Sequence, residues 1–169
     1  MFDQAVVRTG IRYGVICAVF GFTVILILYF TGLNPYGQSS LFSLVFLPVF
    51  IIAGSSSYKK YNDQNLGFLK AFRVALTITF FAALASAMLT YIFSVFAGIE
   101  VIQRHITEMR MAMEAVRAQT IEMIGEANYK QTLAQLEKTT PFNLAMDDFM
   151  KKMLTGFIIS IVAATFFRK

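Results

Sequence analysis

Residues 13–58 decide the fold and read YGVICAVFGFTVILILYFTGLNPYGQSSLFSLVFLPVFIIAGSSSY. None of these 46 side chains is charged. A helix crosses the hydrocarbon core of a bilayer with about 20 apolar residues, so the stretch is long enough for two crossings and a turn. The turn-forming sequence NPYG at 34–37 marks the boundary. The stretch therefore predicts two membrane-spanning helices, at about 13–33 and 41–58, and Pro48 is expected to bend the second.

Two further apolar segments extend this pattern. Residues 74–99 carry no charged side chain and are long enough to cross a bilayer. The segment 149–167 is shorter, and it crosses if Lys151 and Lys152 extend along the helix to place their ammonium groups among the headgroups. The sequence thus predicts an all-α integral membrane protein with four transmembrane helices, in which residues 1–169 form a single membrane domain.

The composition excludes most classes of soluble protein. Of the 169 residues, 57% are hydrophobic and 15% are charged, whereas soluble domains contain about 45–50% and about 25% of these classes. Eighteen Phe and the low charge exclude intrinsic disorder. A single Cys and a single His exclude a disulfide framework and a zinc site. We accordingly expect no cofactor.

Basic residues flank the predicted spans and predict their orientation. Eight Lys and Arg side chains lie at the N-terminal flank, in the second loop and at the C-terminus: Arg8, Arg12, Lys59, Lys60, Lys70, Arg73, Arg168 and Lys169. Residues 100–152 carry seven basic and eight acidic side chains and are close to neutral. Because cytoplasmic loops carry the excess of Lys and Arg, four spans place both termini in the cytoplasm.

The net charge of +5 is interpreted as a membrane-surface charge rather than a nucleic-acid footprint. Besides the lipid bilayer itself, the expected partners are anionic lipid headgroups on the cytoplasmic side. Four residues of the second loop are predicted to make this contact: Lys59, Lys60, Lys70 and Arg73.

The section between the third and fourth spans, 100–148, is predicted to form a long extracytoplasmic helical arm. Five apolar residues in it recur at alternating spacings of four and three, as in a coiled coil: Ile102, Ile106, Met109, Met113 and Val116. The third span is expected to continue as one helix to about Ile124, followed by a return helix. This apolar seam packs either on that return helix or on a second copy of the chain as a homo-oligomer.

Small residues recur every four positions on three of the predicted spans. Such residues let helices approach closely in lipid, where they contact one another within a bundle or between copies. The helices that contain the first and last spans carry six of them: Gly10, Gly14, Ala18, Gly156, Ser160 and Ala164. The helix that contains the third span carries five: Ala71, Ala75, Thr79, Ala83 and Ala87.

Ionisable and nucleophilic groups set the expectation for function. We expect no ionisable side chain inside a span, which argues against ion-coupled carriers, and no nucleophile with a base, so the protein is predicted not to be an enzyme. Two classes remain: a structural or interaction module with the arm as its contact, and a small oligomeric transporter or channel with a polar, uncharged lining. The orientation of Ser86 and Thr90, toward a lumen or toward another helix, distinguishes them.

The segment after the second span carries a motif, YKKYN at 58–62 and GFLKAFR at 67–73, that leads into an apolar span. Over essentially its whole length the chain resembles a bacterial membrane family known as domain of unknown function 4199. Its members share a tyrosine-rich basic loop, an F-x-K-A-F element and a charged helical insertion. The sequence TPF at 140–142 departs from the Asn-Pro-hydrophobic pattern frequent in the family. The resemblance implies four spans in a bacterial inner membrane, and it transfers no catalytic residue.

Overall fold

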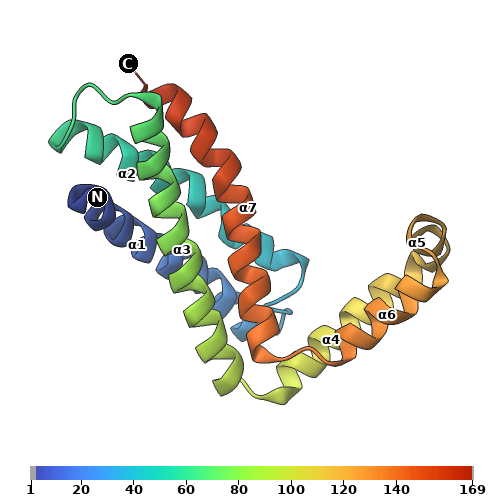
Figure 1. Ribbon diagram of the computed structural model, residues 1–169. Coiled ribbons are helices and arrows are strands. Elements are labelled where there is room, and N and C mark those ends of the chain that lie inside the picture. Colours follow the sequence, from blue (N-terminus) through green and yellow to red (C-terminus); the bar gives the residue numbers. More distant parts are fainter. Residues whose placement is uncertain (1–2, 169) are drawn as a thin grey trace.

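The computed structural model describes residues 3–168, so Lys169 of the basic C-terminus lies outside the described residues. The described chain is helical throughout (Figure 1), in the order α1 (Gln4–Phe30), a 3-10 helix η1 (Gln38–Val45), α2 (Phe46–Tyr61), α3 (Phe68–Phe96), α4 (Ile99–Ala115), α5 (Arg117–Ile124), α6 (Glu126–Glu137) and α7 (Pro141–Phe167). Four helical segments are long and apolar enough to cross a membrane: α1, η1 with α2, α3 and α7. The prediction of an all-α chain with four such helices is confirmed.

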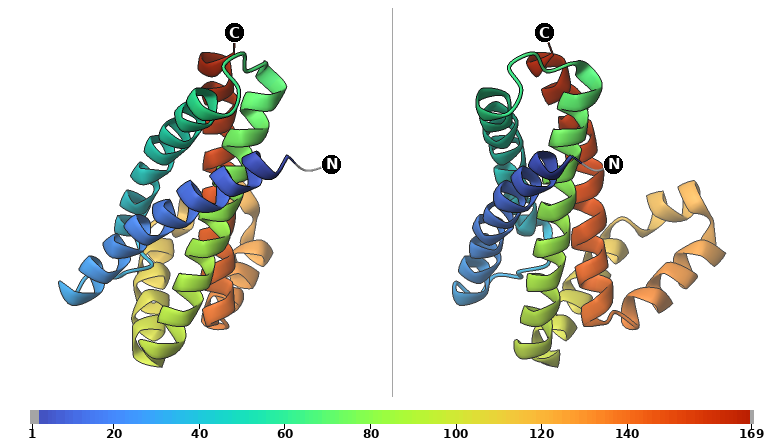
Figure 2. Two further views of the ribbon diagram at one scale, coloured as in Figure 1. Left: turned by 90° about the vertical axis from the view of Figure 1, so that its left-hand side faces the viewer. Right: turned by 60° about the vertical axis from the view of Figure 1, so that its left-hand side comes forward.

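These four segments form a bundle around α3 (Figure 2). Along its length α3 packs against α1 and α7, and α2 contacts all three of these helices. The core lies between them and contains large side chains that are fully buried: Leu47, Ile51, Tyr58, Val74 and Ile78. Large apolar side chains remain exposed on the outside of the bundle, as expected for surfaces that face lipid: Val19, Phe20, Ile27, Val49, Ile52, Phe80, Ile158 and Val162.

The two ends of the bundle differ. The start of α1, the loop between α2 and α3, and the end of α7 gather at one end (Figure 1). At the other end α4, α5 and α6 leave the bundle as a projecting unit, which we call the hairpin (Figures 1 and 2). In the hairpin, α6 runs back beside α4, and Arg110 on α4 forms an ion pair of 3.0 Å with Glu137 on α6.

Local signals explain where the helices begin. Asp3 caps α1 by accepting a hydrogen bond of 3.0 Å from the Ala5 amide. Thr140 caps α7 by accepting from the Asn143 amide, and Pro141 occupies the first helical position, where its missing N–H leaves no bond unmade. Both helices therefore start at residues whose side chains bind a backbone N–H group of the first turn, which has no partner within the helix.

The third span does not continue as one helix into the hairpin, so that prediction is wrong. The helix α3 ends at Phe96, Gly98 adopts a φ of 85°, and α4 begins at Ile99. Glycine adopts this left-handed conformation without the penalty that a Cβ would impose. A second break at Val116 separates α4 from α5.

Pro48, which was expected to bend the second span, lies at the start of α2. The first part of this span, η1, is a 3-10 helix that follows Gly37. Pro48 is the third residue of α2, whose first four N–H groups have no partner within the α-helix. The proline removes no α-helical hydrogen bond there, and the change of helix type from η1 to α2 comes at Phe46, two residues before it.

All six small residues predicted for packing on α1 and α7 are buried. A Cβ built on Gly14 would lie 2.8 Å from the Ala82 nitrogen and 2.8 Å from the Ile78 oxygen of the α3 backbone. Gly156 is similarly closed in by the side chain of Thr79. The hydroxyls of Thr79 and Ser160 lie 3.2 Å apart and link α3 to α7. The small residues thus lie where α3 approaches its two neighbours most closely.

We expect Gly14→Ala to lower the free energy of unfolding by about 1–3 kcal/mol, because the added methyl must push α1 away from the α3 backbone. Gly21→Ala is the matched control on the same helix, since its Cβ would meet ordinary van der Waals contact, 3.4 Å from the Ser43 oxygen. Unfolding of both purified variants in mild detergent measures the difference. Equal stability of the two variants would show that α1 and α3 are not in close contact.

Candidate functional site

A buried ion pair lies between α7 and α3. The Lys152 ammonium contacts an Asp148 carboxylate oxygen one turn away on α7, and only 3% of the Lys152 side chain is exposed. The other carboxylate oxygen of Asp148 accepts a hydrogen bond of 2.7 Å from the Ser86 hydroxyl of α3. Partners are essential here, because an unpaired charge in such a place costs several kcal/mol.

This pair lies on α7, a helix long and apolar enough to cross a membrane, where no ionisable side chain was expected. Lys152 was predicted to extend to the headgroups, whereas it turns into the bundle beside Asp148. The sequence does contain a signal for the pair, because an acid four residues before a lysine lies on the same helix face. That signal is weak alone, since Asp147 and Lys151 have the same spacing one residue earlier.

The Asp147–Lys151 pair has a different environment. Its two charged atoms lie 2.5 Å apart, and the side chains are 57% and 43% exposed. Successive residues of an α-helix point about 100° apart, so tandem pairs shifted by one residue face different surroundings. One pair of α7 therefore belongs to the core of the bundle and the other to its surface.

A polar network attaches α4 to the bundle. The Asn34 amide, in the turn between α1 and η1, donates a hydrogen bond of 2.7 Å to Glu108 and lies 3.1 Å from Nδ1 of His105. Tyr36, two residues further along the turn, has its hydroxyl 2.8 Å from the hydroxyl of Ser94 on α3. The NPYG sequence thus forms the predicted turn and also binds the base of the hairpin.

Burial controls the protonation of this network. It lowers the pKa of His105 below its usual value of 6.5, and the nearby Lys151 charge lowers this pKa further. His105 is therefore neutral at pH 7, and its unprotonated Nδ1 can accept a hydrogen bond from the Asn34 amide. Burial likewise raises the pKa of Tyr36, so its hydroxyl stays protonated.

A cavity of about 680 Å³ opens between the turn, the base of α4 and the start of α7. Cavities of this size accommodate small ligands. Its lining includes the polar network and the outer ion pair: Asn34, Tyr36, His105, Glu108, Asp147 and Lys151. Within residues 3–168, no group of three His, Cys, Asp or Glu side chains is placed to hold a metal ion.

The five residues of the predicted seam differ in burial along α4. Ile102, at the base of α4, is 2% exposed and packs in a small core with Tyr36 and Leu144. Ile106 is half-buried against this core. Met113 is half-buried, whereas Met109 is 38% and Val116 47% exposed. The base of the seam is therefore covered by the bundle, and the outer part is covered incompletely by this chain.

Four of the five Ser and Thr side chains of α3 are buried in the bundle. Ser86 is fully buried and bonded to α7, and Thr90 is 2% exposed, with a hydroxyl that has no hydrogen-bond partner among the described residues. Thr79 and Ser94 are also buried, and Thr77 bonds to the backbone of its own helix. Within a single copy of the chain, Ser86 therefore faces another helix rather than a lumen.

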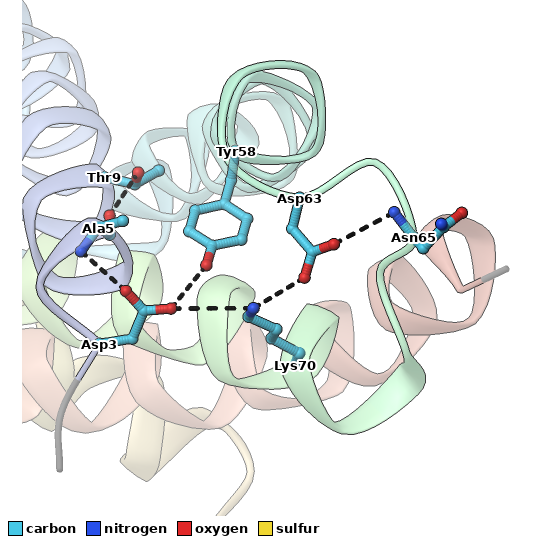
Figure 3. Close-up of polar contacts among 7 residues, drawn as sticks. All are labelled: Asp3, Ala5, Thr9, Tyr58, Asp63, Asn65 and Lys70. Atoms are coloured by element: carbon cyan, nitrogen blue, oxygen red, sulfur yellow. Dashed lines mark hydrogen bonds and ion pairs between the residues drawn. The ribbon is translucent and has the colours of Figure 1, made fainter.

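The basic end of the bundle is held by a second polar cluster (Figure 3). The Lys70 ammonium lies 2.7 Å from Asp63 and 4.0 Å from Asp3, whose carboxylate also accepts a hydrogen bond of 2.8 Å from the Tyr58 hydroxyl. The Tyr58 bond is the main cause that lowers the pKa of Asp3, and the Lys70 bond is the main cause that lowers that of Asp63. These contacts tie the start of α1 to α2 and α3.

The four residues predicted for headgroup contact differ in their surroundings. Lys70 is engaged with Asp63, and Lys59 donates to the Phe167 carbonyl at the end of α7 at 3.3 Å. Lys60 and Arg73 are exposed, and the Lys60 ammonium lies 5.2 Å from the centre of the Tyr61 ring. Two of the four thus bind other parts of the chain, and two face outward.

A double-mutant cycle compares the tandem pairs of α7. We expect Asp148→Asn or Lys152→Met alone to cost about 3–5 kcal/mol of unfolding free energy, because each leaves a buried group without its partner. The double variant should lose much less than the sum. The matched cycle with Asp147→Asn and Lys151→Met should give a coupling of about 0–1 kcal/mol, since that pair is exposed. Similar coupling energies in both cycles, measured by unfolding in detergent, would contradict the burial of Asp148 and Lys152.

Comparison with known proteins places this chain in a family. Residues 12–169 match a family described as protein of unknown function (DUF4199). No curated protein and no solved structure gives a significant match. Since the match covers nearly the whole chain, this protein belongs to the DUF4199 family.

Proposed function

We propose that this chain is a multi-pass protein of the bacterial inner membrane, with both termini in the cytoplasm and the hairpin on the extracytoplasmic side. Two observations support this orientation. The start of α1, the α2–α3 loop and the end of α7 lie at one end of the bundle (Figure 1), and they carry its basic flanks. The hairpin leaves the opposite end with a nearly neutral charge, as the positive-inside rule requires of a translocated segment.

We further propose that the protein acts by binding rather than by catalysis, as an interaction module whose contact element is the hairpin. The observation that carries this proposal is the incomplete cover of the hairpin's apolar side chains. Its outer half exposes Met109, Val116 and Ile124, and Met123 near its tip is 83% exposed. Apolar surface of this kind outside a membrane marks a site of protein contact.

The partner that fits best is a second copy of the hairpin. Its charges alternate as i,i+4 ion pairs, Arg104 with Glu108, Arg110 with Glu114 and Lys130 with Glu126. A surface of mixed, balanced charge can face its own copy across a twofold axis without net repulsion. The heptad-like spacing of the seam is typical of helices that pack in this way.

Disulfide crosslinking tests this contact. Cys17 is buried, so a Cys17→Ala background leaves an introduced cysteine as the reactive thiol. We expect Val116→Cys to form a crosslinked dimer in native membranes and to lose it when Met109→Glu is added. Thr107→Cys, on the opposite face of α4, is the control and should stay monomeric.

The same cysteine reports orientation. In intact cells an impermeant thiol reagent should modify Val116→Cys and should not modify Asp63→Cys. Monomer at both crosslinking positions would contradict the dimer, and a crosslink to a different protein would identify another partner. Labelling at position 63 but not at 116 would reverse the proposed topology.

The buried ion pair favours a second candidate function, a small transporter that works as an oligomer. Ionisable side chains inside a membrane mark pathways of ions or protons. Asp148 and Lys152 lie one residue along α7 from Asp147 and Lys151, which line the cavity at the base of the hairpin. In this alternative the lining includes charged groups, in contrast to the uncharged lining expected from the sequence.

Proteoliposomes loaded with a pH-sensitive dye test this alternative. If α7 conducts protons, the parent protein should dissipate an imposed pH gradient faster than empty liposomes do. Asp148→Asn should remove that excess rate, because it abolishes the titratable carboxylate beside Ser86. Asp147→Asn is the matched control and should keep it, since that carboxylate is exposed rather than buried beside α3. A parent rate equal to that of empty liposomes rejects proton transport by this pair.

A further inference from the structure

A second cavity lies between α1 and α2 at the basic end of the bundle. Its volume is about 550 Å³. The first turns of α1 contribute Arg8 and Arg12, which are four residues apart and so extend from one face of the helix. Across from them, the end of α2 contributes Ser57, Tyr61 and Asn62. Two guanidinium groups thus share a cavity with hydroxyl and amide groups.

These two arginines have no acidic partner among the described residues, and the guanidinium of Arg12 lies 5.8 Å from the centre of the Tyr13 ring. Both acidic residues of this end are already engaged, Asp3 by Tyr58 and Lys70, and Asp63 by Lys70 (Figure 3). In the described part of the chain, residues 3–168, no carboxylate lies within ion-pair distance of Arg8 or Arg12. The cavity is therefore positively charged, and its two exposed guanidinium groups can bind an external anion.

The chemistry of the lining selects the anion. A guanidinium offers a planar fork of donors that matches the oxygens of a phosphate group, and two forks with nearby hydroxyl and amide donors can satisfy several of these oxygens. We propose that the Arg8–Arg12 cavity binds a phosphate group, carried by an anionic lipid headgroup or by a soluble phosphate ester. This proposal does not depend on the function of the hairpin.

The surroundings of the cavity suit a lipid. Arg8 and Arg12 also line a smaller hollow on the outer side of α1, where Val7 and Ile11 are their neighbours. Ile11 and Val15 are 44% and 42% exposed, so the lipid-facing apolar surface of α1 begins beside the arginines. A phosphate bound here would lie at the depth of the headgroups, with apolar surface next to it for acyl chains.

Binding to the purified full-length protein in mild detergent tests the proposal. The probes are dioctanoyl phosphatidylglycerol and, for the soluble source, glycerol 3-phosphate. We expect Arg8→Gln with Arg12→Gln to weaken binding of phosphatidylglycerol by roughly tenfold or more, because two charge-assisted contacts are lost. Lys60→Gln with Arg73→Gln removes the same charge from the same end outside the cavity and should change the affinity much less.

The outcomes separate the sources and the alternatives. Arginine-dependent binding of glycerol 3-phosphate without phosphatidylglycerol binding assigns the cavity to soluble esters and still supports a phosphate site. Equal losses of affinity in the two double variants would show general attraction to a basic surface and would overturn the proposed phosphate site. Failure of both probes to bind would overturn it as well. If the arginine variant fails to fold, Ser57→Leu fills the cavity from α2 with both arginines in place, and it should weaken binding as well.

Discussion

The structure depends on the close approach of α3 to α1 and α7. Between helices in lipid the hydrophobic effect supplies little attraction, so contact area and interhelical hydrogen bonds hold the bundle together. Gly14 lets the backbone of α1 lie against the backbone of α3. Gly156 lets the backbone of α7 lie against the Thr79 side chain of α3. The buried bonds between α3 and α7, from Thr79 to Ser160 and from Ser86 to Asp148, form because these helices are so near.

Much of this fold could be predicted from the sequence because its strongest signals are local. Uninterrupted apolar runs predict four membrane-length helices, and NPYG and Thr140 mark a turn and a helix start that the structure contains. The break at Gly98 could not be predicted in the same way, since a lone glycine inside an apolar run is also tolerated within a helix. The 3-10 helix η1, which packs beside α1, was not predicted either.

The sites were predictable in part. Charge counting identified the basic end, but the intramolecular partners of Lys59 and Lys70 depend on the three-dimensional fold. Arg8 and Arg12 were recognised as flanking charges, and their shared cavity appears only when α2 folds beside α1. Asp148 and Lys152 were overlooked because rotation about the helix axis decides burial, and a short span flanked by two tandem acid–lysine pairs leaves that rotation open.

The tandem pairs of α7 show how that rotation is fixed. Turning α7 by one residue, about 100°, would bring Asp147 and Lys151 toward the core and expose the other pair, with the same charges and the same spacing. The two ion pairs therefore do not determine the rotation of α7 about its axis. The small residues of α7 do determine this rotation, because Gly156 and Ser160 lie one and two turns beyond Lys152 and contact Thr79 of α3. Close packing of these residues sets which carboxylate reaches Ser86, and a charge pair that packing buries needs no energetic advantage of its own to be present.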